Sequence, residues 1–202
     1  MVHLDVPARR TGAGDGRGSR SISRREELLR TAADLFAQRG FHGVTMEELG
    51  AASGISGPAL YHHFSSKGAL LDEMLVSISE ALLRNAETIT SYAADPPSAL
   101  EGLLRAHVAF ALDETALIAV QDRDLVHLSE PAQRRVRQLQ RTYVEVWAER
   151  LRACQPERSE HEARVAVLAV AGLINSTPHS ARLTRDAMEA LLLRMARGAL
   201  AA

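Results

Sequence analysis

The sequence predicts an all-α fold: an N-terminal three-helix domain with a helix-turn-helix, followed by a larger C-terminal helical domain. Apolar residues recur at spacings of three and four, and no segment of useful length alternates between apolar and polar residues. N-cap residues, glycines and prolines separate the helical segments. The predicted parts are a flexible N-terminal arm over 1–20, a helix-turn-helix domain over 21–67, and a larger helical domain over 68–202.

Length and composition agree with this division. The 202 residues suffice for one small and one medium core, and the single Cys154 excludes an internal disulfide framework. No signal peptide and no apolar run of roughly 18 residues is present, which predicts a cytoplasmic protein that does not enter a membrane. The formal net charge of −1 does not suit a protein that coats nucleic acid indiscriminately. DNA affinity must therefore come from a local surface that dimerisation doubles.

The arm and the first helix come first along the chain. The arm carries four arginines among spaced glycines, and two interpretations of it remain open: a segment that enters the minor groove of DNA, or a start without a defined role. Ser23 and Glu26 form a capping box that begins the first helix, and Gly40 ends it.

Residues 45–67 contain the next two helices. Thr45 and Glu48 form a capping box that begins one helix, and Gly54 supplies the tight turn after it. Two short helices joined through a glycine turn form a helix-turn-helix, whose second helix enters the major groove of DNA with its N-terminal residues nearest the bases. This segment therefore predicts double-stranded DNA as a partner.

The second helix, over 57–63, has an unusually bare leading end. Ser56 caps it, and because Pro58 has no N–H, the Ser56 hydroxyl must accept from the N–H of Ala59. Small residues let the backbone approach the duplex, while tyrosine and histidine can donate to phosphate or base edges. The expected DNA contacts are Thr45, Ser56, Gly57, Pro58, Ala59, Tyr61, His62 and Lys67.

Each of these residues also has a structural interpretation. Leu60 and Phe64 are expected to face inward and anchor the helix, and Tyr61 could be a core aromatic as well. Lys67 could be a plain solvated charge. His62 and a second histidine follow one another, but adjacent helical residues point about 100° apart, so no metal site is predicted.

The C-terminal domain is predicted from its caps. A long helix over 67–92 can join the two domains, prolines then stop the chain, and Ser98 with Glu101 begins the next helix. Further helices are expected over 114–128, over 131–154, from Ser159 to Pro178, and from a cap at Thr184 to about residue 199.

The run 165–174 is apolar on every face and contains several small residues. A helix of this kind must be covered on all sides, and about ten residues cannot span a bilayer, so the second cover must be protein. We expect the same helix of a second subunit to supply it, together with Leu191, Leu192 and Met195, in a homodimer with four-helix packing. A central helix in a monomer is the alternative.

Polar residues among apolar ones predict an effector pocket in the middle of the chain. His107 lies within an apolar segment, Arg123 and His127 lie between two, and Tyr143 and Trp147 are one helical turn apart. A pocket with apolar walls and a few fixed polar groups suits a hydrophobic ligand with one polar end. All five could instead be ordinary core or surface residues. Four nearby arginines are either a solvated face or a site for an anionic headgroup: Arg134, Arg135, Arg137 and Arg141.

The elements TMEELG, SGIS and LYHHFSSK, in this order, resemble the N-terminal domain of the tetracycline-repressor (TetR) family over residues 24–75. The resemblance implies DNA contacts at the positions of Thr45, Ser56, Gly57, Tyr61, His62 and Lys67, and a dimer contact through the last two helices. Gly57 departs from the commoner lysine or threonine, which puts a side-chain contact there in doubt. It further implies a homodimeric regulator, a repressor, that a small hydrophobic effector releases from a palindromic operator.

A second resemblance concerns the effector. The segments QDRDLVHL, RLQRTYVEVW and GLINSTPHS are similar to TetR members that control lipid catabolism, which implies an acyl-CoA thioester. One alternative is a DNA-binding protein without an effector, which would have a filled core in place of a cavity. The other is an enzyme, but the sequence has no phosphate loop, nucleophile elbow or His-Glu-x-x-His motif. We therefore expect a protein that is not an enzyme and that has no cofactor and no metal.

Overall fold

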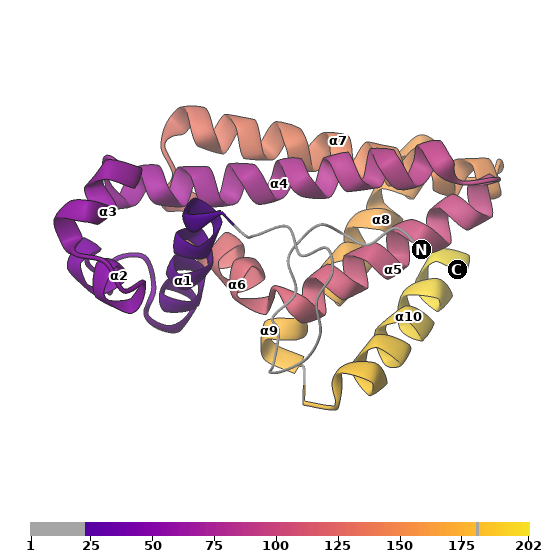
Figure 1. The fold of residues 1–202 in the computed structure, drawn as a ribbon. Helices are drawn as coiled ribbons and strands as arrows, with labels where there is room; N and C mark the ends of the chain where they lie inside the picture. Colours follow the sequence, from indigo (N-terminus) through magenta and orange to yellow (C-terminus); the bar gives the residue numbers. More distant parts are fainter. Residues whose placement is uncertain (1–22, 181) are drawn as a thin grey trace.

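The computed structural model describes residues 23–180 and 182–202, which are helical and contain no strand (Figure 1). The predicted all-α fold is therefore confirmed, while the predicted arm lies outside the described residues. The elements are α1 (Arg24–Arg39), α2 (Met46–Ala52), α3 (Gly57–His63), α4 (Lys67–Tyr92), α5 (Pro96–Asp113), α6 (Thr115–Asp124), the 3₁₀ turn η1 (Leu125–His127), α7 (Glu130–Cys154), α8 (Glu160–Ile174), α9 (Thr177–Ser180) and α10 (Arg185–Ala201).

Helices α1 to α3 form a head at one end of the molecule (Figure 1). Ser23 and Thr45 each cap their helix in a capping box, as predicted. Gly40 and Gly54 have φ angles of 79° and 69°, a left-handed conformation that only glycine adopts without strain. These two glycines end α1 and turn the chain from α2 to α3.

The core of the head continues into the rest of the chain. Leu28, Phe36 and Leu60 pack with the first half of α4, and Val120 and Val136 from α6 and α7 belong to the same cluster of buried side chains. The predicted boundary at residue 67 falls where α4 begins, so it separates residues that share one core. The head is thus supported by α4, α6 and α7 together.

The remaining helices form a body around a second core. Helices α4 and α7 run side by side along its length, and α5, α8 and α10 pack beneath them (Figure 1). Buried residues from all five helices meet there, among them Ile78, Val108, Trp147, Val167 and Leu192. Within the described ranges, no helix is long and apolar enough to cross a membrane.

Three helix ends differ from the sequence-based expectation. Helix α5 begins at Pro96 rather than Ser98, because the Asp95 carboxylate accepts from the N–H of Ser98 at 2.7 Å and both prolines fit the first turn, where no donor is needed. Helix α8 ends at Ile174, and Pro178 lies inside the separate short helix α9. The expected helix over 114–128 is shorter, and its last turn is the 3₁₀ turn η1.

Candidate functional site

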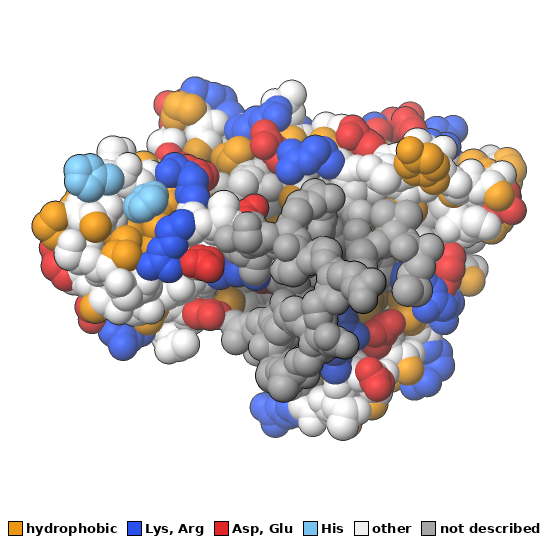
Figure 2. Space-filling model, in the orientation of Figure 1, with side chains coloured by type: hydrophobic (Ala, Val, Ile, Leu, Met, Phe, Trp, Pro, Cys, Tyr) orange, Lys and Arg blue, Asp and Glu red, His pale blue; other side chains and the backbone are white. Residues whose placement is uncertain are grey.

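The surface of α3 is fixed from beneath by Leu60 and Phe64, which are buried as predicted. Arg25 of α1 lies over the Phe64 ring at 4.3 Å from its centroid and donates to the carbonyl of His63 at 2.6 Å. The outer face of α3 carries Tyr61, whose side chain is 50% exposed. Figure 2 shows histidine and Lys or Arg side chains gathered over α3 and α1 at this end of the molecule.

The leading end of α3 has the predicted cap. The Ser56 hydroxyl accepts from the N–H of Ala59 at 3.3 Å, and Ser56 and Pro58 are exposed. A Cβ added at Gly57 would meet Glu47 at ordinary van der Waals distances, with its nearest atom, the side-chain Cγ, at 3.6 Å. The fold of the chain therefore does not require a glycine there, and the bare backbone remains available for close approach by a partner.

Lys67 has a role that the sequence did not indicate. Its ammonium group donates to the carbonyls of Phe41 and Val44, at 2.8 and 2.7 Å, and lies 4.5 Å from the centroid of the Phe41 ring. These contacts fasten the loop between α1 and α2 to the start of α4. An ammonium group has three N–H donors, so these two bonds leave one donor.

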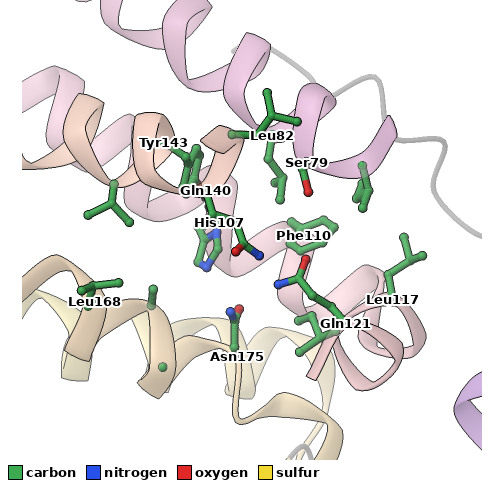
Figure 3. A pocket seen from close by; sticks show the side chains of 16 residues that line it. Ser79, Leu82, His107, Phe110, Leu117, Gln121, Gln140, Tyr143, Leu168 and Asn175 are labelled. Carbon is green, nitrogen blue, oxygen red and sulfur yellow. Dashed lines mark hydrogen bonds between the residues drawn. The ribbon is translucent and has the colours of Figure 1, made fainter. Parts of the chain in front are cut away.

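A cavity of about 300 Å³ lies in the body between α4, α5, α6, α7 and α8 (Figure 3). Its walls are mostly apolar, and none of the described residues that line it is Asp, Glu, Lys or Arg. The polar groups on its walls are neutral side chains from all five helices or their ends: Ser79, His107, Gln121, Gln140, Tyr143 and Asn175.

His107 and Tyr143 form the polar centre of one wall. The Tyr143 hydroxyl lies 3.1 Å from His107 Nδ1, and the buried Trp147 ring packs edge-on against His107 with centroids 5.9 Å apart. Burial lowers the pKa of His107 to about 4, so the imidazole is neutral at pH 7. Burial also raises the pKa of Tyr143 above its usual range, which keeps the phenol protonated.

A basic groove adjoins the cavity at the surface. It measures about 810 Å³, is lined by Arg137, Arg141 and Arg164, and shares Gln140 and Leu168 with the cavity. Arg164 is paired with two glutamates, whereas Arg141 has no acidic partner among the described residues. The apolar cavity therefore opens beside unneutralised positive charge.

Arg123 lies away from the cavity, at the end of α6. Its guanidinium group donates to the carbonyls of Phe36 and Ala37 at the C-terminal end of α1, and to the Asp124 carboxylate at 2.8 and 3.0 Å. A cation at this end of a helix also interacts favourably with the helix dipole. Asp124 is buried in the body, with only 2% of its surface exposed. Arg123 bonds both to Asp124 and to α1, and so joins the body to the head.

His127 lies at the same junction. Its ring stacks on Phe41 with centroids 5.4 Å apart and meets His42 edge-on at 4.4 Å. Within the described part of the chain, no group of three or more His, Cys, Asp or Glu could hold a metal ion there or elsewhere. The junction is thus a packing contact between η1 and the loop after α1.

Two protein-family models match this chain, one over the head and one over most of the body. Residues 28–74 match the model of bacterial regulatory proteins of the tetR family, and residues 93–179 match the tetracyclin repressor-like C-terminal domain. Together the two stretches make up more than half of the chain. The chain belongs to the TetR family. The second stretch runs from the start of α5 to α9, so the cavity lies largely within the TetR-type C-terminal region.

Individual relatives agree with this family. The chain is 39% identical over 84 residues to the HTH-type transcriptional repressor KstR2 of Mycobacterium tuberculosis H37Rv, and 36% identical over 106 residues to KstR2 of Rhodococcus jostii RHA1. These stretches cover 42% and 52% of each protein, so the chain spans about half the length of the curated relatives it matches.

Solved structures extend the similarity over most of the chain. The ketosteroid transcriptional regulator KstR2 of Mycobacterium tuberculosis superposes with a TM-score of 0.74 at 25% identity, covering 87% of this chain and 94% of that one. AibR, solved in complex with isovaleryl coenzyme A and operator DNA, has a TM-score of 0.71 at 19% identity, covering 86% and 97%. The AibR comparison shows a common TetR fold.

The structure brings only part of the predicted effector set together. His107 and Tyr143 line the cavity, and Trp147 packs directly behind them. Arg123 and His127 do not reach it, because α6 directs its last turn at α1 instead. Sequence reasoning missed the neutral amides of the walls, which carry no charge or spacing that separates them from surface residues: Gln121, Gln140 and Asn175.

Proposed function

We propose that this chain is a dimeric cytoplasmic transcription regulator of the TetR family, a repressor, which a hydrophobic effector releases from a palindromic operator. Each head would place α3 in the major groove of one half-site. The exposed side of α3 supports this, because Tyr61, His62 and Ser56 face outward while Leu60 and Phe64 hold the helix from within. Thr45, Pro58 and the bare Gly57 would lie at the same surface.

The dimer would form through α8 and α10. Val165, Leu168, Ala169 and Gly172 occupy positions i, i+3, i+4 and i+7 on one face of α8, and all four are exposed in the single chain. Met195 of α10 is also exposed, and α8 packs against α10. Leu192, expected at this contact, is instead buried in the core of its own body. An apolar face of this kind is typical of a subunit contact.

The effector would be an acyl-CoA thioester, and the observation that supports it is that the cavity and the basic groove adjoin, because Gln140, Val144 and Leu168 line both. The acyl chain would lie in the uncharged cavity, and the anionic nucleotide would lie beside Arg137 and Arg141. Arg123, which the sequence analysis placed in the effector pocket, is already bound to Asp124 and α1. The isovaleryl coenzyme A complex of AibR is a precedent within the fold.

A cavity also argues against a DNA-binding protein without an effector, for which a filled core was expected. Helix α6 supplies a route from the cavity to the head. Leu117, Ile118 and Gln121 line the cavity, and Arg123 lies on the next turn and holds α1. A ligand that displaces α6 would change the position of the head, and a change of a few ångströms in the spacing of two recognition helices weakens simultaneous docking.

The test begins with a duplex selected by the full-length protein from random DNA. Binding of acyl-CoA thioesters of increasing chain length is followed by Trp147 emission, and operator release by fluorescence anisotropy. Affinity should rise about fourfold per methylene until the cavity is full. Coenzyme A alone should leave the operator complex intact. If no chain length binds or releases operator, the proposal is wrong.

The groove is tested with a pair of matched variants. Replacing both Arg137 and Arg141 by alanine should weaken the thioester more than the free fatty acid, because only the thioester carries the nucleotide phosphates. Arg134→Ala is the control, since Arg134 lies on the same helix but pairs with Glu130 and does not line the groove. Equal losses for thioester and free acid would exclude the groove as the headgroup site.

A further inference from the structure

Two buried polar atoms on the cavity wall make no hydrogen bond of good geometry within the described residues, although the Asn175 side chain lies close enough to His107 to interact with its ring: His107 Nε2 and Asn175 Oδ1. His107 comes from α5 and is 5% exposed, and Asn175 follows the last residue of α8. Both line the cavity, and Figure 3 shows the two side chains extending toward each other across it. Leaving such atoms without a well-formed hydrogen bond is unfavourable, so this wall is suited to a polar guest.

The hydrogen bond at His107 Nδ1 determines whether His107 Nε2 is a donor or an acceptor. The part-buried Tyr143 hydroxyl lies 3.1 Å from His107 Nδ1, and its oxygen also faces the Trp147 indole, whose N–H can only donate. The phenol therefore donates its proton to Nδ1. A neutral imidazole has one donor and one acceptor nitrogen, so Nε2 carries the ring proton and is a donor. The amide oxygen of Asn175 is an acceptor.

The rest of the cavity limits the charge of the guest. No acidic or basic side chain lines it, and Ser79 uses its hydroxyl on the carbonyl of Leu75 at 2.7 Å. A carboxylate at this wall would lose its hydration without gaining a cation, which is strongly unfavourable. The cavity thus excludes charged groups from the part of the ligand that it holds.

We propose that His107 and Asn175 form a receptor for a hydroxyl group on the otherwise apolar part of the effector. The hydroxyl oxygen accepts from Nε2–H, and the hydroxyl proton is donated to Oδ1, so one group satisfies both atoms. A ketone satisfies only the donor, and a methylene satisfies neither while displacing the water that would otherwise do so. The inference rests on the proposed effector function of this cavity, and defines the effector as a neutral hydroxylated hydrocarbon or a thioester that carries one.

Three probes of similar shape test it: cyclooctanol, cyclooctanone and cyclooctanecarboxylate. Binding to the full chain is measured by calorimetry and by emission of Trp147, the single tryptophan, whose ring lies 5.9 Å from that of His107. Cyclooctanol should bind most tightly, and the ketone should bind about fivefold more weakly because one hydrogen bond is lost. The carboxylate should bind more weakly than the ketone.

Three variants test whether His107 and Asn175, rather than other residues of the cavity wall, recognise the hydroxyl group. Asn175→Leu should bring the alcohol-to-ketone affinity ratio to about one, and His107→Phe should weaken both probes by about fivefold or more. Ser79→Ala is the control: it should affect both probes equally and preserve the ratio. Thermal midpoints and circular dichroism confirm that each variant is folded.

Failure of the hydroxyl receptor can be distinguished from failure of the proposed effector function. Equal affinity for alcohol and ketone in the wild type, or a ratio that survives Asn175→Leu, overturns the hydroxyl receptor while leaving the effector cavity in place. If none of the three probes binds but acyl-CoA thioesters release the operator, the receptor is overturned alone. If neither the probes nor the thioesters bind, both the receptor and the proposed effector function are wrong.

Discussion

Lys67 holds the loop before α2 in place, and we propose that it also contacts DNA. Lys67→Ala should weaken operator binding and lower the salt slope by about 1, and should also cost about 1–2 kcal/mol of stability, because the carbonyls of Phe41 and Val44 lose a charged donor. Tyr61→Phe is the matched comparison. The exposed Tyr61 hydroxyl has no such internal role, so affinity should fall with an unchanged thermal midpoint.

These effects are measured by anisotropy at several salt concentrations and by thermal unfolding. If Lys67→Ala lowers the thermal midpoint but leaves the salt slope unchanged, the ammonium group has only its structural role. If Tyr61→Phe lowers stability and not affinity, Tyr61 is not a DNA contact.

His107 should make the stability of the protein depend on pH. Its pKa is about 4 when folded and 6.5 in the unfolded reference, so the unfolded chain binds more protons between these values. Stability contributed by the neutral ring is present above pH 6.5 and is lost as the pH falls toward 4. From pH 7.5 to pH 5 the loss should be about 2 kcal/mol.

Urea unfolding at both pH values checks this, with His107→Phe expected to lose less stability than the wild type over the same range. The exposed His161 supplies the control, since His161→Gln should retain the wild-type pH dependence. Identical pH dependence in the wild type and His107→Phe would contradict burial of a neutral imidazole.

At the residue scale, the sequence predicted some residues of the cavity wall but not all of them, and the misassigned residues have a physical explanation. His107 was predicted from an apolar segment, and Tyr143 and Trp147 from their spacing of one helical turn. His107 and Tyr143 do line the cavity, and Trp147 packs against both. The position of Arg123 between apolar segments is compatible with either a pocket or a helix end, and only the direction of α6 decides between them.

At the scale of elements, α6 connects the two regions, because it lines the cavity and also bonds to α1 of the head. Arg123→Ala should leave effector affinity nearly unchanged, because Arg123 does not line the cavity. It should nevertheless reduce operator release, since the bonds to Phe36 and Ala37 that transmit a shift of α6 to α1 are removed. The expected result is a protein that binds effector and stays on DNA.

The measurement compares Trp147 emission with anisotropy of labelled operator during one effector titration. Arg185→Ala is the control, because Arg185 forms a similar pair with Asp113 but lies far from the head along the chain and contacts no head residue. Full release of operator by saturated Arg123→Ala would exclude this junction from the response.

Helix ends were predictable where a cap uses side chain and backbone in the usual pattern. Ser23, Thr45 and Ser159 each form the expected capping box. The predicted start of α5 at Ser98 was wrong because Asp95, not Ser98, is the N-cap. The Asp95 carboxylate accepts from the Ser98 N–H, and Glu101 pairs with Arg197 instead of completing a capping box with Ser98. Tertiary ion pairs of this kind are not visible in a local pattern.

At the scale of the whole molecule, the exposed face of α8 is the surface through which we propose that two subunits assemble. A Cβ added at Gly172 would meet nothing within 4 Å in the single chain, so Gly172→Arg should fold. In a dimer it would place a long charged side chain in the apolar contact, which should split the subunits and abolish cooperative operator binding.

Sedimentation velocity and circular dichroism on Gly172→Arg test this together. Ala94→Arg, at an exposed site between α4 and α5, is the control and should remain dimeric. A wild-type protein that sediments as a monomer at micromolar concentrations would refute the dimer, and an unfolded Gly172→Arg would contradict the open space found around this residue.

The junction at α6 also sets a rule for exchanging heads between regulators. Arg123 bonds to backbone carbonyls, which any head offers if its first helix ends at the position of Gly40. The stack of His127 on Phe41 is different, because it needs an aromatic ring in the incoming loop. A chimeric sensor built on this body should keep its effector response when the foreign loop carries such a ring. With an aliphatic residue there, it should bind its operator but respond poorly.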